Sequence, residues 1–108
     1  MIALDQYVSR QEAAAVRRLV SHALAHDWII SVNDGEEWTV KKSRDRNEIL
    51  AALGTTDSDT LRFRDTEGES VGVIVLIYQG GNSPAEEVIH DYSDNEAMEY
   101  LVRRTFPA

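Results

Sequence analysis

Residues 60–78 read TLRFRDTEGESVGVIVLIY, and this segment sets the architecture of the chain. In its first part Leu61 and Phe63 alternate with polar residues, which is the period of a strand with one buried face. The residues DTEGE at 65–69 then form a turn, and Val71 to Tyr78 is almost entirely apolar and rich in β-branched side chains. We therefore predict a hairpin whose second strand is central in a sheet and covered on both faces.

A second hairpin is predicted upstream of this segment. Trp28, Ile30 and Val32 form one alternating set, Trp38 and Val40 form another, and the turn residues NDG lie between them at 33–35. Both tryptophans are expected to point into the core, with a pocket wall or a dimer face as the alternative. Two hairpins favour antiparallel pairing throughout the sheet.

The first two helices are marked by their caps. The first helix begins at the capping box of Ser9 and Glu12 and ends near His26. The second helix spans about Asp45 to Leu53, with Asp45 in its first turn and a glycine directly after it. The polar residues from Thr55 to Asp59 are predicted to form a loop.

The last strand and the last helix follow a break at GGNSP, residues 80–84. Val88 to Tyr92 is the predicted strand, and Ser93 with Glu96 forms a second capping box at the start of the closing helix, which Pro107 ends. The element order is αββαβββα. We predict a single α+β domain over residues 1–108, with a mainly antiparallel five-stranded sheet and helices packed on it.

The composition excludes several kinds of site and location. The chain has no cysteine, which rules out disulfides, thiolate zinc sites and cysteine nucleophiles. It has neither an apolar run long enough to cross a membrane nor a secretion signal, so we expect a cytoplasmic protein without membrane contact. The net charge is −8, of which residues 1–54 carry −1 and residues 55–108 carry −7. A negative charge of this size repels phosphate groups, so nucleic acid is disfavoured as a partner. The charge either serves only to keep the protein soluble or forms an acidic surface that binds a basic protein partner.

Motifs for metals and cofactors are incomplete. His22 and His26 share one helical face, but the sequence supplies no third ligand. The residues HDYSDNE at 90–96 fail as a calcium loop, because Glu96 stands where glycine is needed and Val102 where the bidentate glutamate is needed. The glycines after residue 79 match no phosphate-binding motif. We predict no metal, no cofactor and no catalytic residue.

One segment nevertheless gathers polar functional groups. The candidate binding residues are Tyr78, Asn82, His90, Asp91, Tyr92 and Asn95. Adjacent residues of a strand point to opposite faces, so His90 and Asp91 are not expected to form a catalytic pair by themselves. The structural interpretation of this segment is a strand end followed by a helix cap.

The positive charges of the first half form a smaller feature. Lys41, Lys42, Arg44 and Arg46 follow one another closely, and the first predicted helix carries Arg10, Arg17 and Arg18. These two groups could converge into an anion-binding surface, although a solvated surface is the expected outcome.

The second half of the chain also carries a set of hairpin and turn residues: DTLRF at 59–63, glycines at 68 and 72, LIYQGGN at 76–82 and IHDYSDN at 89–95. This set resembles a pattern in small uncharacterised bacterial proteins of plasmid and prophage regions. The resemblance implies a common fold of this type and implies no activity.

These observations do not point to a particular chemical reaction. We expect a non-catalytic interaction or accessory domain, homodimeric, that presents its acidic second half to a partner. The alternative is a small-molecule-binding protein or simple enzyme with a pocket near Tyr78, Asn82, His90 and Tyr92. A mimic of nucleic acid is a third interpretation.

Overall fold

The computed structural model describes residues 8–79 and 84–106. In this part of the chain five strands form one antiparallel sheet in the order β2-β1-β3-β4-β5. The strands are β1 (Ile29–Asn33), β2 (Trp38–Ser43), β3 (Ser58–Arg64), β4 (Ser70–Ile77) and β5 (Ile89–Tyr92). The helices are α1 (Arg10–Ala25), α2 (Arg46–Ala52) and α3 (Glu96–Thr105), with a short 3-10 helix η1 (Ala85–Val88) before β5. This arrangement confirms the predicted α+β fold. None of the helices in the described residues is long and apolar enough to cross a membrane.

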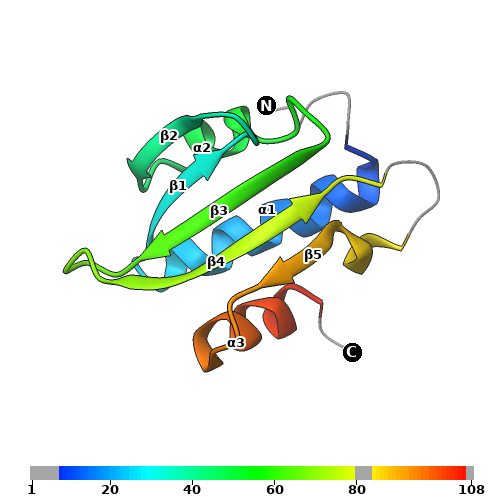
Figure 1. Cartoon of the computed structure of the whole chain (residues 1–108). Coiled ribbons are helices and arrows are strands. Elements are labelled where there is room, and N and C mark those ends of the chain that lie inside the picture. Colours follow the sequence, from blue (N-terminus) through cyan, green and yellow to red (C-terminus); the bar gives the residue numbers. More distant parts are fainter. Residues whose placement is uncertain (1–7, 80–83, 107–108) are drawn as a thin grey trace.

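All three helices lie on the same face of the sheet (Figure 1). The core between the two layers contains apolar side chains of every helix and of the facing side of the strands, all fully buried: Leu19, Val20, Ile30, Ile49, Leu50, Leu61, Phe63, Ile74, Leu76, Met98 and Leu101. Burial along β3 and β4 alternates strictly from residue to residue. The second face of the sheet is therefore open to solvent, and we call it the open face.

The open face corrects one expectation about β4. The run from Val71 to Tyr78 is not covered on both faces, because Val73, Val75 and Ile77 alternate with buried neighbours and remain partly exposed. An antiparallel sheet commonly has one solvated face, and β-branched residues favour strands even where no second layer covers them.

Two element boundaries also differ from the sequence prediction. Asp59 belongs to β3 rather than to the preceding loop. The second capping box does not form, because Ser93 continues the sheet: its N–H donates to Val73 O and its Oγ accepts from Val73 N, each at 2.9 Å. Asn95 caps α3 instead, and its side chain accepts from Met98 N at 2.9 Å.

The first capping box forms as predicted and extends further than a local cap. Glu12 Oε1 accepts from Ser9 N at 3.0 Å, and Ser9 Oγ accepts from Glu12 N at 3.2 Å. Glu12 Oε2 also accepts from Gln79 N at 2.6 Å, two residues after the end of β4. The fully buried carboxylate therefore joins the start of α1 to the end of the central hairpin.

A tight contact between β4 and α3 leads to a stability prediction. A Cβ at Gly72 would lie 2.5 Å from Met98 Cγ and 2.8 Å from Met98 Sδ, inside the core. Gly72→Ala should therefore lower the free energy of unfolding by about 1–3 kcal/mol, measured by urea denaturation. In a Met98→Ala background the same substitution should cost clearly less, because the clash with Met98 is gone and only the backbone strain of an L residue at the positive φ of Gly72, 158°, remains. An equal cost in both backgrounds would contradict this contact.

Candidate functional site

The residues predicted from sequence to line one site do not all lie together. Tyr78 is buried on the helix-covered face. Asp91 pairs with Val75 of the open face and, with Tyr92, borders a shallow depression beside Val73 and Val75. His90 and Asp91 are exposed, and Tyr92 is 37% exposed. Asn95 is used as the cap of α3, and Asn82 lies outside the described residues. The structure thus brings Asp91 and Tyr92 together and places Tyr78 on the other side of the sheet.

Tyr78 has a partner that the sequence interpretation missed. Its hydroxyl donates to Asp59 Oδ2 at 2.6 Å, and the same oxygen accepts from Gly54 N at 2.9 Å. Asp59 is 1% exposed, and its Oδ1 is buried without a hydrogen-bond partner among the described residues. The pair connects β3, the residue that follows β4 and Gly54, which lies two residues after the end of α2.

Burial dominates the electrostatics of this pair. It raises the pKa of the Asp59 carboxyl from an ordinary 3.8 to about 6, although the hydrogen bonds from Tyr78 and Gly54 act in the opposite direction. Burial and the neighbouring Asp59 carboxylate also raise the pKa of Tyr78 far above its usual range. Both side chains are buried and bond to each other, and neither is among the residues that line the three depressions on the described part of the chain.

The two histidines of α1 have separate surroundings. His26 stacks on Trp28, with ring centroids 5.0 Å apart, and meets the ring of Tyr100 edge-on at 5.3 Å. His22 borders a groove between α1 and α3. The described residues contain no group of three or more His, Asp or Glu side chains that could hold a metal ion.

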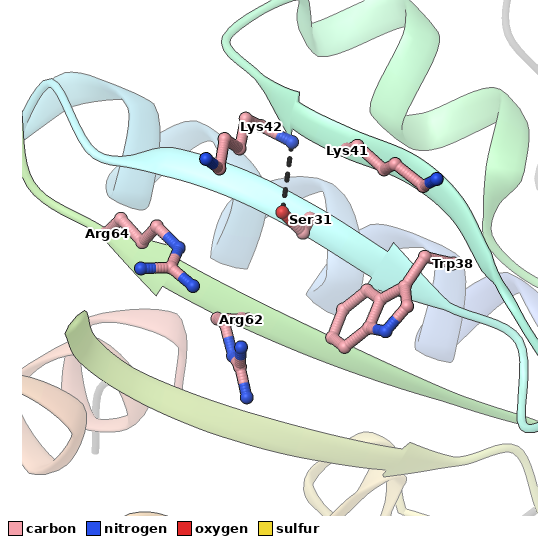
Figure 2. Close-up of a pocket in the computed structure, with 6 residues that line it drawn as sticks. All are labelled: Ser31, Trp38, Lys41, Lys42, Arg62 and Arg64. Carbon is pink, nitrogen blue, oxygen red and sulfur yellow. Dashed lines mark hydrogen bonds between the residues drawn. The ribbon is translucent and has the colours of Figure 1, made fainter. Parts of the chain in front are cut away.

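A depression on the open face combines aromatic and basic side chains. Six residues from three adjacent strands line it: Ser31, Trp38, Lys41, Lys42, Arg62 and Arg64 (Figure 2). Four of them are cations and none is a carboxylate. We call this group the basic-aromatic depression.

Irregular pairing of β2 produces this cluster. The register between β1 and β2 shifts twice, so Val32 pairs with Val40 but the next residue of β1, Asn33, pairs with Trp38. The shift places Val40 toward the core and Trp38 on the open face. The prediction that Trp38 points into the core was therefore wrong.

The other register shift, between Ile30 and Val32 of β1, brings two lysines of β2 to the same face. Lys42 adopts a left-handed backbone with φ of 55°, and its N–H donates to Ser31 Oγ at 2.9 Å. As a result Lys41 and Lys42 both border the depression, whereas Val40 and Ser43 on either side are buried. An unshifted strand would have pointed the two lysines to opposite faces.

The arginines of β3 complete the depression. The Arg62 guanidinium lies 5.4 Å from the centroid of the Trp38 ring, which is within the range of a cation–π contact. Arg64 Nη1 donates to Gly68 O at 3.0 Å, and Arg64 Nε is buried without a hydrogen-bond partner among the described residues. Each of the two arginines is thus held by one contact, and the Nε of Arg64 remains as an unused hydrogen-bond donor.

The basic run does not converge with the arginines of α1 into one surface. Lys41 and Lys42 instead join the arginines of β3. Arg44 pairs with Asp27 at 2.9 Å, and Arg46 Nε donates to Ser21 Oγ at 2.9 Å. The Arg44–Asp27 pair is the one salt bridge found among residues 8–79 and 84–106.

A second basic feature lies on the opposite side of the molecule. The groove between α1 and α3 is lined by Arg18, His22, Tyr100, Arg103 and Arg104 and has a volume of about 520 Å³. Arg18 Nε donates to Thr105 O at 3.0 Å, and the Arg104 guanidinium lies 6.0 Å from the centroid of the Tyr100 ring.

The raised pKa of Asp59 predicts how stability depends on pH. The folded protein binds more protons than the unfolded chain between about pH 4 and pH 6, so the free energy of unfolding should fall as the pH rises through this window and then level off. The contribution of this one group is about 2–3 kcal/mol. Asp59→Asn keeps an oxygen for both hydrogen bonds and should flatten the decline in urea titrations.

Tyr78→Phe provides the matched control, because it removes the phenol donor while the carboxyl stays buried. The hydrogen bond from Tyr78 lowers the pKa of Asp59, so its loss should move the decline to higher pH. The same pH dependence in wild type and Asp59→Asn would show that Asp59 does not titrate in this range.

No protein-family model, curated protein or solved structure matches the chain. The function is therefore inferred from the geometry of its surface. Among the depressions described, the basic-aromatic depression combines an exposed tryptophan, four cations and a buried unpaired donor.

Proposed function

We propose that this protein is a non-catalytic interaction domain that binds an acidic segment of a partner protein on its open face. The observation that carries the proposal is the convergence of Trp38, Lys41, Lys42, Arg62 and Arg64 with no carboxylate among the lining residues. Tryptophan and arginine are the side chains that most often dominate the binding energy of protein interfaces. Four adjacent cations repel one another, and carboxylates of a partner would relieve that repulsion.

The same face offers apolar contact beside the charges. Val73, Val75 and Ile77 are partly exposed on β4, the strand next to Arg62 and Arg64 on β3. A segment that lies across the sheet would place its carboxylates over the cations and its apolar side chains over β4. The favoured partner is therefore acidic and amphipathic.

The edges of the sheet are poorer docking places than its face. Edge strands attract additional strands unless they are short, charged or irregular. At one edge β2 is interrupted by two register shifts and carries both lysines. At the other edge β5 has only four residues and a further shift in its pairing with β4. Both edges thus carry features that discourage strand addition.

A long nucleic acid fits this surface less well than a short acidic peptide. The turn that precedes Trp38 carries Asp34, Glu36 and Glu37, and the turn that follows Arg64 carries Asp65, Glu67 and Glu69. These turns lie at opposite ends of the paired strands and bound the positive region on both sides. A polyanion that extended past either turn would meet like charge.

Three further expectations from the sequence concern a homodimer, a basic partner and a small-molecule site. A homodimer that paired the two basic-aromatic depressions would oppose cations to cations, so we place any dimer contact on another surface. The acidic turns are a second region, suited to a basic protein partner. A small-molecule site around His90, Asp91 and Tyr92 receives less support, because Tyr78 does not reach it.

The proposal predicts a salt-sensitive and residue-specific interaction. A short fluorescent peptide of alternating glutamate and leucine should bind at low salt, detected by anisotropy. Arg62→Glu should weaken binding at least about tenfold, because it reverses one of four clustered charges, and Trp38→Ala should weaken it comparably. Arg10→Glu changes the net charge equally on an exposed turn of α1 and should alter affinity by less than about twofold.

Three outcomes would contradict the proposal. The first is no binding of the acidic peptide at low salt. The second is an equal loss of affinity in the Arg62→Glu and Arg10→Glu variants, which would indicate a general effect of net charge. The third is tighter binding of a single-stranded oligothymidylate than of the peptide, which would identify the face as a nucleic-acid surface.

A further inference from the structure

We propose that the groove between α1 and α3 is a second binding site, specific for a phosphate-bearing small molecule. Three arginines and a histidine from two helices line it, together with Tyr100. The groove lies on the helical side of the molecule, so it is separate from the open face (Figure 1). The inference is independent of the function proposed above.

Arg18 is fixed in a position suited to an anion. Its Nε donates to Thr105 O at 3.0 Å, and Thr105 is itself 1% exposed, with its Oγ1 donating to Leu101 O at 2.8 Å. This anchor uses one N–H of the guanidinium and leaves its two terminal nitrogens for a ligand. A guanidinium held in advance loses less conformational freedom when it binds phosphate.

The cations of the groove come from two different helices. Arg103 and Arg104 lie in the last turn of α3, where basic residues also complement the helix dipole. Arg18 and His22 come from α1, are four residues apart and point to the same groove. The dipole of α3 therefore explains why two arginines lie at the end of that helix. It does not explain why Arg18 and His22 of α1 face the same groove, whereas binding of one anion by both helices does.

The charges of the groove are not neutralised by the protein itself. None of Arg18, Arg103 and Arg104 forms a salt bridge with a carboxylate of the described residues. This is notable in a chain with 19 acidic and 11 basic residues. Guanidinium groups bind phosphate oxygens in a bidentate manner, and three of them match the oxygens of one or two phosphate groups.

The size of the groove favours a small molecule over a bare ion. Its volume of about 520 Å³ falls within the range of small-molecule sites, which is roughly 300–1,000 Å³. Tyr100 is 43% exposed and offers part of its ring to the uncharged portion of such a ligand. A phosphorylated sugar combines the required charge and size.

The structure also supplies a reporter for the experiment. Tyr100 contacts His26 edge-on, and His26 stacks on Trp28, so a ligand at Tyr100 is two ring contacts away from an indole. The chain has two tryptophans, and Trp38→Phe leaves Trp28 as the single tryptophan, whose emission can be excited at 295 nm apart from that of the four tyrosines. In this background, titration with pyrophosphate and with ribose 5-phosphate should change the Trp28 emission in a saturable manner.

Matched variants test the assignment. Arg103→Gln should weaken both ligands by about tenfold, because it removes one bidentate contact. Arg18→Lys keeps the charge but cannot keep the same anchor and fork geometry, so it should also weaken binding several-fold. Arg10→Gln removes an equal charge from another part of α1 and should leave the affinity unchanged. Isothermal titration calorimetry on the same variants provides a second readout.

Each result bears directly on the proposal. Saturable binding of ribose 5-phosphate but not of ribose, lost in Arg103→Gln and retained in Arg10→Gln, supports it. The absence of saturation by either phosphate ligand overturns it, as does equal weakening by Arg103→Gln and Arg10→Gln. A response to sodium chloride of the same size as the response to pyrophosphate would also overturn it, because it would indicate general ionic screening.

Discussion

All three helices pack on one face of the sheet, and most of the molecule's surface properties follow from that arrangement. The covered face holds the apolar core, so every second residue of β1, β3 and β4 is committed to packing. On β3 and β4 the alternate residues are partly exposed and are released from that constraint. On β3 they include Arg62 and Arg64, and on β4 they include Val73, Val75 and Ile77. The open face therefore gains a charged region and an apolar region side by side without cost to the core.

Charge segregation is the second consequence of this layered design. Carboxylates gather in the two turns that bound the paired strands, while cations gather on the open face and in the groove between α1 and α3. Surface salt bridges contribute little to stability, so the fold does not require that these charges pair within the chain. Stability comes instead from the apolar core and from buried hydrogen bonds such as those of Glu12 and Asp59. The surface charges are then available for recognition.

The sequence predicts the elements well because their signals are local. The periodicity of 60–78, the capping box at Ser9 and the aspartate cap of α2 all lead to the correct elements and order. Asp59 was missed because TTDSD reads as a loop, whereas pairing of Asp59 with Leu76 places it within β3. At α3 two caps compete, and the sheet contacts of Ser93 decide in favour of Asn95. Such outcomes depend on distant partners.

The candidate site was predictable only in part for the same reason. The alternation that points Arg62 and Arg64 away from the core is visible in the sequence. Their meeting with Lys41 and Lys42 requires that β1 lie between β2 and β3, and it requires the left-handed backbone of Lys42. Neither the strand order nor the register shift has a local signal. From the sequence alone, the basic residues 41–46 were therefore grouped with the arginines of α1, whereas Lys41 and Lys42 lie beside the arginines of β3.

The carboxylate of Glu12 has a consequence for the order of folding. One oxygen completes a cap within a single turn, and the other reaches a backbone amide 67 residues further along the chain. The first turn of α1 thus acquires its full set of contacts only after the β3–β4 hairpin has docked. Formation of the amino-terminal helix is thereby coupled to a contact of high sequence separation, which makes that turn a late-consolidating part of a chain whose hairpins are otherwise local.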